Sequence, residues 1–132
     1  MLDGSRNLKI WDCIIPGLPK TAWENGRYKL TVLFSKYHPI VPPICAFWNT
    51  IYHPNVMMGS GIVVMDLLED SWNTSFTITD ILISINRLLA YPEMENPVNE
   101  EALQCFIYNR EEFDVEARIA SLETREEEGD YP

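Results

Sequence analysis

Two segments near the start of the chain alternate apolar and polar residues with the two-residue period of a half-buried strand. They cover residues 8–15 and 27–34, and a shorter apolar run predicts a third strand over 44–48. The Asn25-Gly26 pair before the second strand favours a tight turn with a positive φ. The pattern therefore predicts an antiparallel hairpin with a long connection, followed by one more strand.

The apolar period changes to that of a helix after residue 77. Apolar residues recur at i, i+3, i+4 and i+7 from Ile78 to Leu89, and Thr77 and Asp80 are spaced as a capping box. The preceding stretch, 51–75, carries little regular pattern and is rich in Gly, Pro, Asn and Ser. A connection this long in a compact domain is usually functional.

Two further helices are predicted near the end of the chain. Asn99 is placed to cap one that ends at about Tyr108, and a third, polar helix is predicted over 110–122. We expect residues 123–132 to fray. Strands first and helices afterwards indicate one α+β domain over 1–132, an antiparallel meander sheet with helices packed on one face.

The charge balance narrows the choice of partners. The 132 residues include 20 acidic and 10 basic ones, a net charge of −10. Nucleic acids and anionic membranes require basic patches, so neither is expected as a partner. Residues 100–132 alone carry a net charge of −8, which indicates solvated helix faces. No apolar run approaches a membrane span and no signal peptide is evident, so we expect a cytoplasmic or nuclear protein.

The three cysteines, Cys13, Cys45 and Cys105, show no paired metal-ligand spacing, and their odd number leaves one over in any disulfide scheme. Each lies among apolar neighbours, where a thiol is most often a small core residue. We expect all three to be reduced and buried. No metal and no cofactor is predicted.

The order and spacing of several motifs resemble those of the ubiquitin-conjugating enzymes from about residue 7 to residue 120. In chain order they are Trp11–Gly17, Thr21–Gly26, Tyr37–Pro43, Ile51–Val56, Gly61–Leu68, Trp72 and Pro92–Asn99. The resemblance implies the UBC-like fold. It also implies a reaction in which ubiquitin, or a related modifier, is carried as a thioester on a cysteine and passed to a substrate lysine, usually with a ligase holding both.

That chemistry needs a thiol nucleophile, an amide that holds the adjoining loop or stabilises the oxyanion, and an acidic group that positions the lysine. The resemblance assigns the amide to Asn55, within a retained His53-Pro54-Asn55 motif. It also matches Asp66 to the small acidic or polar residue beside the site, which is retained.

At two of the matched positions the residue lacks the reactive group that the family carries there. Val64 stands where the family places its cysteine, and Asn96 stands where many members carry the acidic residue. Ser60 is the nearest hydroxyl, but no histidine other than His53 is close in sequence to activate it. Without a thiol no thioester can form, so no intact catalytic residue set is predicted.

The family's ligase-binding loops are matched in part. Ile40 and Val41 keep an apolar tip in the first loop, whereas the second has Asn73-Thr74-Ser75 in place of the Ser-Pro-Ala of many ligase-binding members. The family also begins with a basic amphipathic helix. Only six residues precede the matched segment here, so we expect that helix to be absent from this chain.

Three hypotheses follow. The first is a catalytically inactive variant that binds ubiquitin or a related modifier, an active conjugating enzyme, or a RING-type ligase. The alternative is an active ubiquitin-conjugating enzyme that carries ubiquitin as a thioester, which would need a nucleophile that the sequence does not offer. The third is a decayed or alternatively started form without activity.

Overall fold

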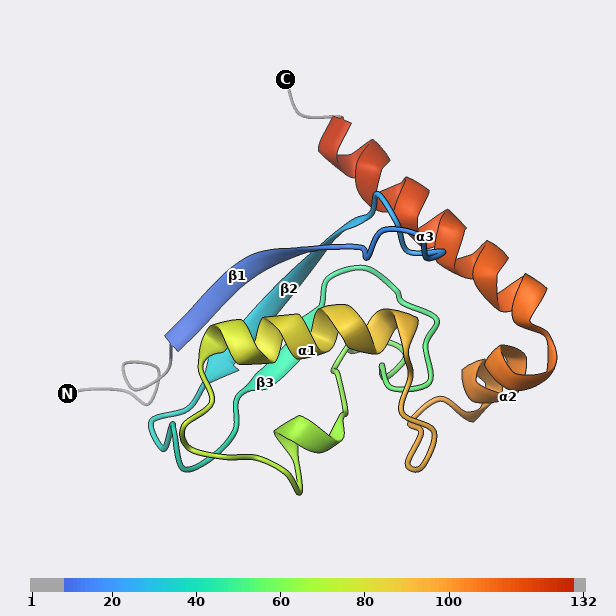
Figure 1. The fold of residues 1–132 in the computed structure, drawn as a ribbon. Coiled ribbons are helices and arrows are strands. Elements are labelled where there is room, and N and C mark those ends of the chain that lie inside the picture. The colour runs from blue at the N-terminus through green and yellow to red at the C-terminus, as the bar shows by residue number, and fades with distance from the viewer. Residues whose placement is uncertain (1–8, 130–132) are drawn as a thin grey trace.

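Three antiparallel strands form a single sheet in the computed structural model, which describes residues 9–129. The order in the sheet is β1 (Lys9–Pro16), β2 (Arg27–Phe34), β3 (Ile44–Phe47). The α-helices of the described residues all follow the sheet in the chain (Figure 1); they are α1 (Ile78–Ala90), α2 (Glu100–Tyr108) and α3 (Arg110–Gly129). The predicted α+β class is confirmed.

The connection between β1 and β2 closes as the turn chemistry predicts. Gly17 N–H donates to the carbonyl oxygen of Gly26 at 3.0 Å, and Asn25 adopts a φ of 69°. Asparagine tolerates this left-handed region better than other side chains. Gly26 is required for a different reason, since a Cβ there would overlap the ring of Tyr28.

Helix α1 begins with the predicted capping box. The Thr77 side chain accepts from Asp80 N–H at 3.1 Å, and the Asp80 carboxylate accepts from Thr77 N–H at 2.8 Å. Its apolar stripe is buried against one face of the sheet. Together they form the core, whose largest fully buried side chains include Tyr28, Leu30, Val32, Ile81, Ile85 and Leu89.

Helix α2 begins at the predicted cap, where the Asn99 side chain accepts from Ala102 N–H at 3.1 Å. Helix α3 differs from the prediction, because it continues past Leu122 to Gly129. Thr124 explains the extension: it is 2% exposed, and its hydroxyl accepts from Arg27 N–H at 3.0 Å. This contact fixes the helix beyond its predicted end against the start of β2.

Two predictions fall on residues that the structure does not describe. The absence of a first helix concerns the residues ahead of Lys9, and the last part of the expected frayed end is 130–132; both lie outside the described residues. Among the described residues, no helix is both long enough and apolar enough to span a membrane.

Candidate functional site

The segment that contains Val64 runs along the outer edge of β3. Phe47 N–H donates to the carbonyl oxygen of Gly61 at 2.9 Å, and Val63 N–H donates to that of Cys45 at 2.8 Å. Gly61 has a φ of 76°, and a Cβ there would overlap the carbonyl oxygen of Phe47. The close approach of two backbones therefore requires glycine at the start of this segment.

The His53-Pro54-Asn55 motif is buried under α1. His53 is 0% exposed; its Nε2 lies 2.8 Å from the carbonyl oxygen of Leu88, and its Nδ1 accepts from Asn55 N–H at 3.0 Å. These partners require a neutral ring with the proton on Nε2. Burial lowers the pKa of His53 to about 4, against the raising effect of the Leu88 and Leu89 backbones. His53 is therefore a structural residue and is unavailable as a general base.

The side-chain amide of Asn55 holds the loop that follows α1. Its Nδ2 donates to the carbonyl oxygen of Glu93 at 2.9 Å, and its Oδ1 accepts from Glu93 N–H at 2.9 Å. Asn55 is 1% exposed. Of the two roles that the resemblance implies for this amide, the observed contacts fit the loop-holding one.

Glu93 also reaches the other side of the site. One of its carboxylate oxygens, Oε1, accepts from Asp66 N–H at 2.8 Å, at the start of the short 3-10 helix η2 (Asp66–Leu68). The Asp66 carboxylate in turn accepts from the Ser71 hydroxyl. Glu93 was not predicted as a site residue, because nothing in its local sequence indicates that it joins two segments distant in the chain.

Val64 and Asn96 line one cavity of about 350 Å³. Val64 is half-buried, and its N–H donates to the carbonyl oxygen of Asn55 at 2.8 Å. The two positions that lack family chemistry thus lie together. The other lining residues include five carboxylates and are Met65, Asp66, Glu69, Asp70, Glu93, Met94 and Glu95. The cavity thus has an acidic wall, and no thiol lines it.

None of the cysteines lines this cavity. Cys45 is 0% exposed, and desolvation raises its pKa to about 12. Cys13 and Cys105 are only half-buried, so the prediction that all three are buried is wrong for these two. Cys13 faces the core from β1, which among residues 9–129 has a neighbouring strand on one side only. Burial raises the pKa of both half-buried thiols.

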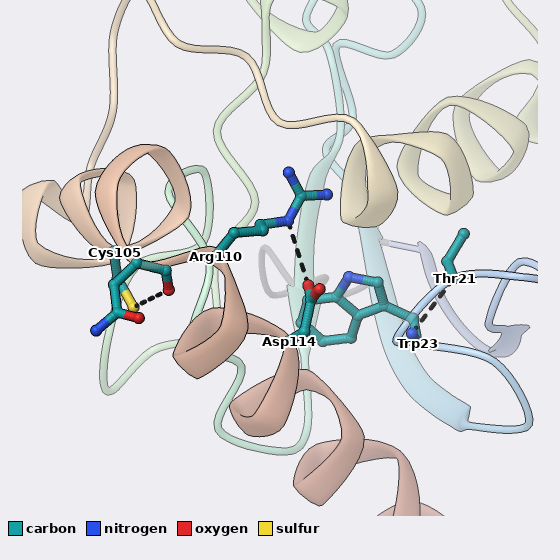
Figure 2. A network of polar contacts seen from close by, with 6 residues as sticks. Thr21, Trp23, Cys105, Arg110 and Asp114 are labelled. Atoms are coloured by element: carbon teal, nitrogen blue, oxygen red, sulfur yellow. Dashed lines mark hydrogen bonds and ion pairs between the residues drawn. The ribbon is translucent and has the colours of Figure 1, made fainter.

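Cys105 lies on α2, where its thiol points toward the C-terminal end of the helix. Its Sγ donates to the carbonyl oxygen of Asn109 at 3.6 Å (Figure 2). After desolvation, the negative charge of Glu112 is the next cause of its raised pKa. A raised pKa leaves less of the thiol as the nucleophilic thiolate at neutral pH.

The two loops matched to ligase binding lie side by side. Trp72 Nε1–H donates to the carbonyl oxygen of Pro39 at 2.9 Å, which joins the second loop to the first. Ile40 is 75% exposed and Val41 is 42% exposed. Asn73, Thr74 and Ser75 are also exposed, with the Asn73 side chain accepting from Ser75 N–H at 2.8 Å. The loops form one surface, and its role in ligase binding stays a prediction.

Ser60 gains no activating partner from the fold. Its hydroxyl oxygen accepts from Ile62 N–H at 3.2 Å on an exposed turn. Within residues 9–129, no group of His, Cys, Asp and Glu side chains is arranged to hold a metal ion.

Comparison with known proteins points to one family. A family model described as "Ubiquitin-conjugating enzyme" matches residues 1–120. A protein named SUMO-conjugating enzyme UBC9, from Caenorhabditis elegans, is 41% identical over 114 residues, which are 85% of this chain and 68% of the relative. Sumo-conjugating enzyme ubc9 from Dictyostelium discoideum is 40% identical over 121 residues, 90% of this chain and 76% of the relative.

Proposed function

Because this chain belongs to the ubiquitin-conjugating enzyme family, we propose that it is a non-catalytic member that acts by binding a ubiquitin-like modifier or a protein that handles one. The observation that carries the proposal is Val64. Val64 lines the cavity and stands at the position that the resemblance matches to the family's cysteine. Its side chain offers no atom that could accept the modifier.

The hydrogen bonds around the cavity that Val64 lines support the first hypothesis, a folded binding protein, over the third, a decayed form. Asn55 keeps both side-chain bonds to the Glu93 backbone, and Glu93 keeps its contact with Asp66 N–H. Buried polar groups are costly when left without partners, and here they are satisfied. These satisfied contacts support a folded binding protein.

The outer face of the sheet offers a surface for binding. The strand register places Ile10, Leu33 and Ile44 in one row across the three strands on the face opposite the core. Ile10 is 63% exposed and Ile44 is 51% exposed, and Ile14 is 43% exposed on the same face of β1. Exposed apolar side chains gathered on one face mark interaction sites.

Trp48 stands at the end of this face as a rigid aromatic group. It is 57% exposed; its Nε1–H donates to the Thr31 hydroxyl at 2.7 Å, and that hydroxyl donates to Asp12 at 2.9 Å. Lys29 Nζ lies 5.4 Å from its ring centroid. Tryptophan side chains held in place before binding are common energetic centres of interfaces.

The modifier that we propose is SUMO, since the two relatives are both named SUMO-conjugating enzymes. It would bind non-covalently on the outer face of the sheet. Ubiquitin, an active conjugating enzyme and a RING-type ligase are the other partners that the family membership suggests.

Calorimetric titration of the chain with SUMO tests the binding proposal. We expect saturable binding that Trp48→Ala or Ile14→Asp weakens by about 10-fold, as for a central interface residue. Ile83→Asp is the matched control, because Ile83 is 55% exposed on α1, away from the sheet's outer face. Absence of binding to SUMO, ubiquitin, an active conjugating enzyme and a RING domain would overturn the proposal.

A second experiment tests the non-catalytic part. The chain is mixed with activating enzyme, ATP and SUMO or ubiquitin, and products are separated with and without reductant. We expect no reductant-sensitive adduct. A thiol-labile band that survives Val64→Ala and disappears with Cys45→Ser would show an active enzyme with a different nucleophile.

A further inference from the structure

Helix α3 carries two apolar stripes, only one of which packs on the core. The buried stripe comprises Phe113, Ala117 and Ala120, and the second comprises Val115, Ile119 and Leu122. Members of the second stripe are 49%, 46% and 49% exposed and recur at i, i+4 and i+7, so they lie on one side of the helix. Helix α3 lies at the edge of the molecule (Figure 1). A helix that is apolar on two sides is typical of one with a second packing partner.

The second stripe has the spacing of a coiled-coil seam. Val115 and Leu122 take the d positions of a heptad and Ile119 takes the a position between them. Within parallel coiled coils, a β-branched residue at a with leucine at d, here Ile119 and Leu122, favours two strands over larger bundles. Phe113 and Ala120 of the buried stripe then take b positions and Ala117 takes an f position, on the side of the helix away from the seam.

The two edges of the seam carry opposite charges. Glu116 and Glu123 occupy the e positions, whereas Arg118 and Arg125 occupy g positions. In a parallel pair each g residue faces the e residue five positions later on the other helix, so Arg118 would meet Glu123 of a second copy, twice by symmetry. An antiparallel pair would instead place like charges together. The charge pattern therefore selects a second copy in parallel orientation.

The start of α3 does not extend the seam. Glu111 at g would face Glu116 of a second copy, which is a like-charge pair. Asp114, one turn before Arg118, is bound by Arg110, whose Nε lies 3.2 Å from its Oδ1 (Figure 2). The favourable contacts are thus confined to the segment from Val115 to Glu123.

We propose that this face of α3 is a self-association surface, through which two copies of the chain pair as parallel helices about a two-fold axis. The helix is already formed, because its other face packs on the core, so little ordering entropy opposes pairing. With three apolar residues in the seam, the area that each copy buries is small compared with the roughly 800 Å² per partner of a standard interface. The dimer is therefore weak and concentration-dependent.

Sedimentation equilibrium over a wide concentration range tests the proposal at an ionic strength of about 0.15 M, where the Debye length of roughly 8 Å screens the net charge. We expect a monomer–dimer equilibrium whose association constant falls about 10-fold or more with Leu122→Asp. Ile83→Asp, an equally accessible helix position, leaves it unchanged. Thermal unfolding of each variant confirms that the monomer fold is kept.

Charge exchange tests the orientation. Arg118→Glu and Glu123→Arg each weaken association, and the double variant restores it, because the exchanged pair again has opposite signs. A monomer at every concentration, or association that ignores Leu122→Asp, would overturn the proposal. If the double variant associated no more strongly than the single variants, the parallel arrangement would be overturned.

Discussion

The Asn55 side chain holds the Glu93 backbone at both of its polar groups, donating to the carbonyl oxygen and accepting from the N–H, each at 2.9 Å. A family motif and a loop distant in the chain are joined by one amide. Because the Glu93 carboxylate reaches Asp66 N–H, this contact also sets the wall of the cavity that Val64 lines.

Replacing Asn55 by alanine should destabilise the fold more than a surface change does. The substitution leaves the partly buried backbone N–H and carbonyl of Glu93 without these partners, at a cost of roughly 1–3 kcal/mol in the free energy of unfolding. Asn96→Ala, on an exposed part of the same loop, should change it by less than about 0.5 kcal/mol. Urea unfolding of both variants measures the difference. Equal effects would contradict the loop-holding role.

Stability should fall as pH is lowered from 7 to 5 because of His53. Burial lowers its folded pKa to about 4, below the ordinary value of 6.5, so the unfolded chain binds the proton more readily between these values. The contribution of the neutral His53 ring to the free energy of unfolding is complete above pH 6.5. It is lost as the pH falls toward 4. We expect unfolding to be easier at pH 5 by about 2 kcal/mol.

The control for this pH dependence is a pair of histidine variants. His53→Gln should remove most of the dependence between pH 7 and pH 5, even if it lowers the stability at both. His38→Gln should keep it, because His38 is exposed. If His38→Gln removed the pH dependence of stability and His53→Gln kept it, burial of His53 would not be its cause.

A thiol introduced by Val64→Cys should be slow to react at neutral pH. Asp66, Glu69 and Asp70, with two further carboxylates, line the same cavity and disfavour a nearby thiolate. The pKa of the new thiol should lie above the ordinary value of about 8.5. Alkylation rates against pH report it, with Ser60→Cys on the exposed turn as the reference. Equal profiles for the two thiols would remove the electrostatic argument.

Enzymatic charging extends this prediction. Val64→Cys should charge with modifier very slowly, and Asn96→Asp added to it should improve lysine discharge more than charging, because an acidic group acts on the incoming amine. Single-turnover assays separate the two steps. Charging at the rate of an active family member would contradict the expectation.

Gly59 and Gly61 allow backbone strain from a positive φ to be separated from steric overlap of an added Cβ. Gly59 has a φ of 87° with open space around a Cβ, whereas Gly61 has a φ of 76° and a Cβ that would overlap the Phe47 carbonyl oxygen. Gly59→Ala should cost about 1–2 kcal/mol from backbone strain alone. Gly61→Ala should cost more, since strain and overlap add. Thermal unfolding of both variants ranks them, and a reversed order would show that the close approach at Gly61 can relax.

The sequence alone determined the features that depend on near neighbours in the chain. The strand segments appear with their predicted pattern, and α1 and α2 begin at the predicted caps Thr77 and Asn99. Such caps are hydrogen bonds over three residues, so the local sequence contains both partners. Likewise the absence of a thiol at position 64 is a property of the residue type, which folding cannot change.

Tertiary structure decided everything that needs a distant partner. Glu93 joins the site through Asn55 and Asp66, α3 continues past Leu122 because Thr124 meets Arg27, and Cys13 stays half-buried because β1 is an edge strand. Each outcome rests on contacts between segments far apart in the chain, whose pairing no local pattern encodes. The sequence thus determines which groups are available, and the packing of the sheet and helices decides which of them meet.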